Sequence, residues 1–208
     1  MDYGSSDRGL HVPPLAVPPA RRDDGAPPIT STKIVVSGGF GVGKTTLVTS
    51  VSEIEPLTTE SVMTVMSEAT DRLDGLPDKV TTTVAMDFGR VTLADDLVLY
   101  LFGTPGQGRF QFMWDDLVRG AVGAVVLVDT RRVEECFPAI DYFERSGLPF
   151  VVAINKFDGA PIYQDADLRD ALSLRPQTPL IACDARDRRS AADALASVVM
   201  HALQVATG

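Results

Sequence analysis

One stretch of the chain has the residue types and the spacing of a phosphate-binding loop. The nine residues Gly38–Thr46, GGFGVGKTT, match the pattern G-x-x-x-x-G-K-[ST]. Glycines allow backbone N–H groups to turn inward around a phosphate, and a following helix N-terminus adds the positive end of its dipole. Lys44 supplies a positive charge for the outer phosphates, and the Thr45 hydroxyl is placed to bind Mg²⁺. We expect a nucleoside triphosphate to bind at Gly38, Phe40, Gly41, Val42, Gly43, Lys44, Thr45 and Thr46.

A second motif, Asn155-Lys156-Phe157-Asp158, directly follows an apolar segment. The carboxylate of Asp158 can accept two parallel hydrogen bonds from the ring N–H and the exocyclic amine of guanine, a pair that adenine does not offer. The stem of Lys156 can lie along the base, and Asn155 can tie this segment to the phosphate loop. Alone, N-K-x-D is a weak motif. After a strand, in a chain that also has a phosphate loop, it favours guanine over adenine.

The elements that must position these motifs alternate between strands and helices from Lys33 onward. Strands are expected at 34–36, 84–93, 97–102, 123–128, 149–154 and 180–183, and helices at 45–51, 110–118, 133–145, 167–174 and 190–205. The short connection at 94–96 predicts a hairpin, Ser190 is expected to cap the last helix, and the segment 61–66 fits either a short helix or a strand. The pattern predicts an α/β fold of the three-layer P-loop NTPase type, a mostly parallel six-stranded sheet with one antiparallel hairpin edge and helices on both faces. Each motif falls at the carboxyl end of a strand, where such sheets bind ligands.

Composition bounds the remaining possibilities. The length of 208 residues fits one domain at 31–208 preceded by a disordered arm at 1–30, because three proline pairs interrupt the arm. The net charge of −9 argues against nucleic acid and anionic lipid as main partners. Cys136 and Cys183 match no metal or redox spacing, which favours a cytoplasmic setting. No export signal is visible, and no apolar run is long enough for direct membrane insertion.

Three further segments follow the order found in one large family. Thr83–Gly89, TVAMDFG, is similar to T-I-G-V-D-F-G of Rab-type proteins, and Gly103–Phe110, GTPGQGRF, is similar to D-T-A-G-Q-E-R-F. Cys183–Arg186, CDAR, stands where that family has T-S-A-K. Together with the two motifs above, these segments resemble the Ras-superfamily small GTPases over nearly the whole chain after Lys33. The resemblance implies a GTPase that binds GTP or GDP with Mg²⁺ and serves in signal transduction.

The resemblance also implies roles for single residues. Thr83 would bind Mg²⁺ together with Thr45 and would sense the γ-phosphate, which Gly106 would also contact. Gln107 would orient the attacking water, and Lys44 would stabilise the charge of the transferred phosphoryl group. The guanine base would be held by Asn155, Lys156, Asp158, Asp184, Ala185 and Arg186, with the Ala185 N–H on its carbonyl.

Two departures from the family narrow the resemblance. Gly103 stands where the family has an aspartate that steadies Mg²⁺, and Pro105 replaces an alanine. The resulting T-P-G-Q resembles the bacterial MglA-type GTPases. The runs at 38–41, 87–90, 102–107 and 128–132 look most like the GTPase component of actinobacterial conservon operons. Members of that group accompany a Roadblock-fold protein and a sensor-kinase-like membrane protein, so the resemblance implies partners of this kind and recruitment to the membrane by one of them.

These departures have expected consequences for the chemistry. Loss of the carboxylate at Gly103 is expected to weaken Mg²⁺ retention, since outer-shell groups contribute about 10–100-fold in metal affinity. Pro105 stiffens the loop before Gln107, so intrinsic hydrolysis is expected to be slow and accelerated by a partner. Arg72 can serve as an internal arginine finger, as an arginine does in MglA-type proteins, or it is a solvated loop residue.

Several interpretations remain open at this point. The protein is either a switch that hydrolyses GTP or a nucleotide-loaded scaffold with little turnover. A P-loop ATPase or kinase would leave Asp158 without a role. Phe112 lies off the apolar helical stripe and is a candidate contact for a partner. Asp129 either ends a strand and caps a turn, or it binds the metal ion in place of the missing aspartate.

Overall fold

The computed structural model describes residues 29–55, 57–65, 80–106 and 108–207, with side chains at 29–55, 86–106 and 110–207. The expected arm up to residue 28, Arg72 and Gln107 therefore lie outside the described residues. Within the described ranges, no helix is long and apolar enough to cross a membrane.

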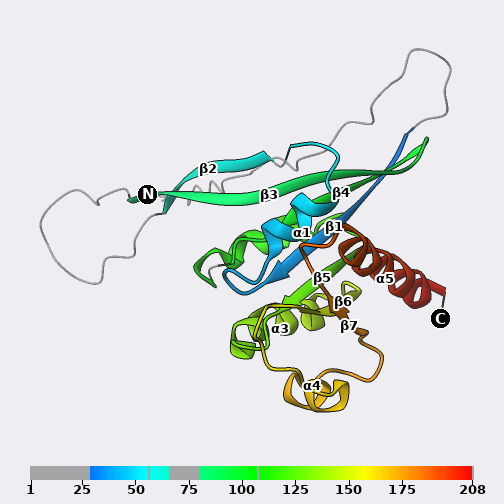
Figure 1. Ribbon diagram of the computed structural model, residues 1–208. Coiled ribbons are helices and arrows are strands. Elements are labelled where there is room, and N and C mark those ends of the chain that lie inside the picture. The colour runs from blue at the N-terminus through cyan, green and yellow to red at the C-terminus, as the bar shows by residue number, and fades with distance from the viewer. Residues whose placement is uncertain (1–28, 56, 66–79, 107, 208) are drawn as a thin grey trace, which may run out of the picture.

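A seven-stranded sheet forms the middle layer of the molecule (Figure 1). Its spatial order is β2-β3-β4-β1-β5-β6-β7, and β3 is antiparallel to both of its neighbours, whereas β4, β1, β5, β6 and β7 run parallel. The strands are β1 (Thr30–Gly38), β2 (Leu57–Val65), β3 (Val80–Ala94), β4 (Leu97–Gly103), β5 (Gly123–Val128), β6 (Phe150–Asn155) and β7 (Leu180–Cys183).

The expected fold class is confirmed, and all six expected strands are present. The addition is β2, which covers most of the segment that the sequence left open between helix and strand. Its residues, LTTESVMTV, are rich in β-branched side chains, and they pair with β3 along their whole length. One edge of the sheet is therefore β2, so the β3–β4 hairpin lies one strand further in instead of at the edge.

Helices cover both faces of the sheet (Figure 1). They are α1 (Lys44–Val51), α2 (Trp114–Val118), α3 (Phe137–Ser146), α4 (Asp165–Ala171) and α5 (Arg188–Thr207), with 3₁₀ turns η1 (Gly108–Met113) and η2 (Val133–Cys136). Alternate residues of β1 point to opposite faces: Ile34 packs in the cluster with α1 and α5, and Val35 packs in the cluster with α2 and α3. Every residue of β5 is buried, as its continuous apolar sequence predicts for a strand covered on both sides.

One capping prediction is wrong. The last helix begins at Arg188, and the backbone N–H of Ser190 donates to Oδ1 of Asp187 at 2.7 Å. Asp187 therefore caps this helix, because a carboxylate just before the first turn accepts one of its unpaired N–H groups. The hydroxyl oxygen of Ser190 accepts instead from the backbone N–H of Asp184 at 2.9 Å.

Candidate nucleotide-binding site

The phosphate-loop motif connects β1 to α1 at the carboxyl end of the central strand. Gly38, Gly41 and Gly43 all have positive φ angles, of 134°, 68° and 104°. A side chain at Gly43 would lie 2.5 Å from Nδ2 of Asn155, so that position needs glycine for space as well as for conformation. Gly43 is also the N-cap of α1 and gives it no side-chain hydrogen bond, which leaves the first N–H groups of α1 without a side-chain cap.

The Lys44 ammonium is held inside this loop. Nζ donates to the carbonyls of Gly38 at 3.0 Å and Gly39 at 2.7 Å, and the residue is only 8% exposed. Burial lowers the pKa of Lys44 to about 8, and the charges of Asp87 and Glu135 oppose that shift. A phosphate anion beside Nζ would favour the charged ammonium.

Thr45, the expected metal ligand, has an anionic neighbour that the sequence did not reveal. Its Oγ1 donates to Oδ2 of Asp87 at 2.8 Å. A Cβ at Gly103 would lie 2.9 Å from that same Oδ2 and 3.0 Å from the Cβ of Asp87. The carboxylate of Asp87 therefore fills the space in which a side chain at Gly103 would stand.

The site does contain a carboxylate beside Gly103, that of Asp87, and the expectation that Mg²⁺ is held weakly stays a prediction. The anion comes from β3 instead of from the end of β4. A hydroxyl and a carboxylate oxygen are hard donors of the kind that Mg²⁺ prefers, and such sites use one or two carboxylates with substrate phosphates. Among the described residues, no group of three or more His, Cys, Asp or Glu side chains could hold a metal ion. Thr83 lies in the β2–β3 pairing opposite Val62, and its role at the metal stays a prediction.

The segment after β4 packs against the phosphate loop. A Cβ at Gly106 would lie 2.7 Å from Nζ of Lys44 and 3.0 Å from the Cα of Phe40, so only glycine fits there without displacement. Thr104 anchors the start of the segment, because its backbone N–H donates to Val36 O at 2.8 Å and its hydroxyl donates to Ser37 Oγ at 3.0 Å. The side chain of Phe40 is 64% exposed.

Asn155 joins the phosphate loop to the second motif, as its position after a strand predicted. Nδ2 donates to the carbonyl of Val42 at 2.8 Å, and Oδ1 accepts from the backbone N–H of Ala185 at 3.0 Å. Asn155 is 4% exposed, so these bonds are shielded from water. The backbone N–H of Lys156 donates to Cys183 O at 2.8 Å, which ties β6 to β7.

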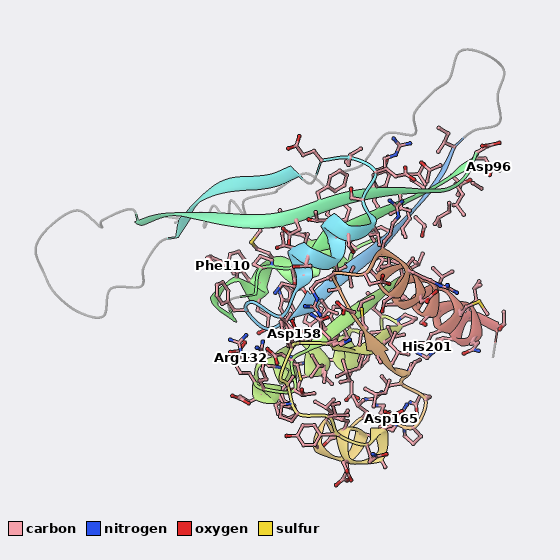
Figure 2. The ribbon with its side chains drawn as sticks, in the orientation of Figure 1. Asp96, Phe110, Arg132, Asp158, Asp165 and His201 are labelled. Atoms are coloured by element: carbon pink, nitrogen blue, oxygen red, sulfur yellow. The ribbon has the colours of Figure 1, made fainter. Side chains whose placement is uncertain are left out.

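Asp158 follows this buried anchor and points its carboxylate outward, with 83% of its side chain exposed. Both oxygens accept hydrogen bonds from Arg186, whose guanidinium also binds Asp184. Hydrogen bonding and the charge of Arg186 lower the pKa of Asp158, which keeps it ionised and able to accept. Figure 2 shows Asp158 and Arg132 at the same end of the sheet, away from Asp96 and His201.

Asp129 directly follows β5 and caps the next turn, which is one of its two predicted roles. It is 3% exposed and accepts from the backbone N–H, Nε and Nη2 of Arg131, at 2.9, 2.9 and 2.7 Å. Its alternative as a metal ligand has no support, because both oxygens are taken by arginine. The sequence also missed Arg132, whose Nη2 donates to Phe40 O at 3.1 Å and braces the phosphate loop.

Comparisons with known proteins identify a family and a relative that this chain resembles. A family model described as a conserved hypothetical ATP binding protein matches residues 36–205. The uncharacterized protein MJ1339 of Methanocaldococcus jannaschii is 33% identical over 128 residues, which are 61% of this chain and 70% of that protein.

Two solved structures share the fold. The FeoB G-domain from Methanococcus jannaschii has a TM-score of 0.55 at 14% identity and covers 84% of this chain and 99% of its own. The cytosolic domain of the T. maritima FeoB iron transporter in a GDP form has a TM-score of 0.59 at 16% identity and covers 85% of this chain and 65% of its own. These likenesses establish a fold of the P-loop GTPase type.

Proposed function

The chain belongs to the family of conserved hypothetical ATP binding proteins, and we propose that the nucleotide it binds is a guanine nucleotide, together with Mg²⁺. One observation carries the proposal. The buried side chain of Asn155 joins the phosphate loop at Val42 to Ala185, which supports the proposal that Asp158 and the loop bind one ligand. A carboxylate accepts the paired donors of guanine, whereas the edge of adenine presents one donor and one acceptor. The GDP form of the T. maritima FeoB domain supports the same choice.

Each part of the nucleotide has residues that fit it. The N–H groups at the start of α1 and the ammonium of Lys44 bind the phosphates. The hydroxyl oxygen of Thr45 would bind Mg²⁺, and the carboxylate of Asp87, which accepts from that hydroxyl, would orient it; the ion would neutralise phosphate charge when bound. The backbone N–H of Ala185 is proposed to bind the base carbonyl, with the stem of Lys156 along the ring.

We further propose slow GTP hydrolysis that acts as a switch. Gly106 packs against Lys44 and Phe40, so a γ-phosphate entering there would contact the segment that leads to Gln107. Gln107 is proposed to orient water, and Arg72 is an additional candidate cation. Stimulation by a Roadblock-fold protein, and membrane recruitment by a sensor-kinase-like protein, follow from the resemblance to the conservon and MglA-type GTPases.

Two measurements test this function. GTP is expected to displace a fluorescent nucleotide from the purified chain at lower concentration than ATP does. Stronger displacement by ATP would favour the alternative of a P-loop ATPase or kinase. Single-turnover hydrolysis of bound GTP, alone and with a Roadblock-fold protein, is expected to be slow and then accelerated. No turnover under either condition would leave a nucleotide-loaded scaffold.

Nucleotide affinity is expected to fall at alkaline pH because of Lys44. Its pKa of about 8 means that the ammonium loses its proton above pH 8, whereas phosphate binding favours the protonated form. Between pH 7 and pH 9 the Kd for GDP is therefore expected to rise about tenfold, by linkage between proton and ligand binding. Fluorescence titration with a GDP analogue measures this rise.

The matched control is Lys44→Arg, since a guanidinium stays charged throughout this range. Any rise in Kd with pH that persists in the arginine variant is caused by titration of the guanine base or of a group other than Lys44. A Kd for the unmodified chain that stays constant from pH 7 to pH 9 would contradict the assignment of Lys44 to the phosphates.

A further inference from the structure

The carboxylate of Asp158 is already paired with a side chain of the same chain. Nη1 of Arg186 donates to Oδ2 of Asp158 at 3.1 Å, and Nη2 donates to Oδ1 at 3.3 Å. One planar fork of N–H donors thus engages both oxygens. Arg186 lies 28 residues further along the chain, just before α5, so the folded structure and not the local sequence creates this contact.

A guanine base needs the same two oxygens. Its ring N–H and exocyclic amine form a parallel pair of donors, and the guanidinium presents a pair of the same kind. Two such pairs cannot face one edge of a carboxylate at the same time. We propose that Arg186 is a guanine surrogate within the chain, which competes with the base for Asp158 and must leave it before the base is fully bound. This inference rests on the proposed guanine-binding function.

Asp184 gives Arg186 a place to remain after it leaves Asp158. Nε of Arg186 donates to Oδ1 of Asp184 at 2.9 Å, and Nη2 donates to Oδ2 at 3.0 Å. The side chain of Asp184 is 22% exposed, against 83% for Asp158, and Ser190 fixes its backbone N–H. The contact with Asp158 is thus the more exposed and weaker part of the network, and its release keeps the pair with Asp184.

The competition is selective for the base. Guanine must displace Arg186, whereas adenine does not present the donor pair and leaves the Arg186–Asp158 contact in place. Arg186 therefore lowers affinity for guanine nucleotides without lowering affinity for adenine nucleotides. Arg186 thus reduces the difference in affinity between guanine and adenine nucleotides, which makes it a specificity-determining residue.

The test compares Arg186→Ala with the unmodified chain, using a fluorescent N-methylanthraniloyl GDP and the matching ADP probe. Loss of an exposed ion pair of this kind predicts that the Kd for the GDP probe falls about two- to fivefold in the variant, with the Kd for the ADP probe unchanged. Arg189→Ala is the matched control, since it removes the same charge from an exposed position in α5, and the Arg189 side chain makes no hydrogen bond or ion pair with the described residues. It is expected to leave both Kd values unchanged. Raising NaCl from about 50 mM to about 500 mM is expected to shrink the difference, because salt screens the pair.

Other outcomes separate the inference from the function. A higher Kd for the GDP probe in Arg186→Ala would overturn the competition and make Arg186 a support for the base. An equal Kd, or an equal fall in Arg189→Ala, would also overturn it, while binding of GDP by the unmodified chain would leave the proposed function intact. Failure of the unmodified chain to bind the GDP probe would overturn both.

Discussion

Replacing Asp158 by asparagine is expected to lower affinity for GDP by about 10²- to 10⁴-fold, because two hydrogen bonds to a charged group contribute about 1.5–3 kcal/mol each. The amide offers one acceptor and one donor in place of two acceptors. Xanthine carries a carbonyl where guanine has its exocyclic amine, so the variant is expected to prefer xanthine nucleotides. Displacement of a fluorescent nucleotide by GDP and by XDP measures the change.

Asp165→Asn serves as the matched control for this experiment. Asp165 is an exposed aspartate at the start of α4, distant from Asp158 in Figure 2, so its replacement removes the same charge away from the site. It is expected to leave base preference unchanged. If Asp158→Asn keeps the GDP preference of the unmodified chain, Asp158 does not select the base.

The second large effect concerns Asp87. Removing its carboxylate by Asp87→Ala is expected to lower the apparent affinity for Mg²⁺ about 10–100-fold, as for other groups that orient a metal ligand. The reason is its 2.8 Å contact with Thr45, the residue proposed to bind the metal. The Mg²⁺ concentration that half-saturates GDP retention is the quantity to measure, and Asp87→Asn controls for shape.

An exchange of positions sharpens this test. Gly103→Asp alone is expected to destabilise the fold, since its Cβ would meet the Asp87 side chain at 2.9 Å. With Asp87→Gly in the same chain the space is open, and the relocated carboxylate is expected to restore part of the Mg²⁺ dependence. Unaltered Mg²⁺ dependence in Asp87→Ala would contradict the role of this residue.

Local motifs predicted much of the fold and of the candidate site. The glycine pattern at 38–43 determines a loop conformation from its own residues, and the apolar runs before Gly38 and Asn155 are strands as expected. Because both motifs end parallel strands, their meeting followed from the topology, and the Asn155–Val42 hydrogen bond spans 113 residues.

Asp87 could not be predicted in the same way, because its position depends on strand register. The β3–β4 hairpin pairs Ala94 with Leu97, but an irregularity between Thr92 and Ala94 shifts the pairing, so that Phe88 faces Phe102. Asp87 and Gly103 come next and are neighbours for this reason. Without that one-residue shift Asp87 would point to the other face of the sheet. Sequence spacing alone does not reveal a bulge of this kind.

The contact between Arg186 and Asp158 and the capping of α5 escaped prediction for a related reason. Asp184, Asp187 and Ser190 are all able to cap a helix, and their spacing does not say which one ends the loop. The choice of Asp187 leaves Asp184 free to hold Arg186, which in turn reaches Asp158. Such a network depends on which of several similar polar side chains makes each contact, and each exposed contact alone contributes little free energy.

Isothermal titration of the purified chain with GDP and with ADP, each in the presence of Mg²⁺, tests the central claim most directly. The account predicts saturable binding of GDP and much weaker binding of ADP. Tighter binding of ADP, or no heat with either GDP or GTP from a folded sample, would contradict it.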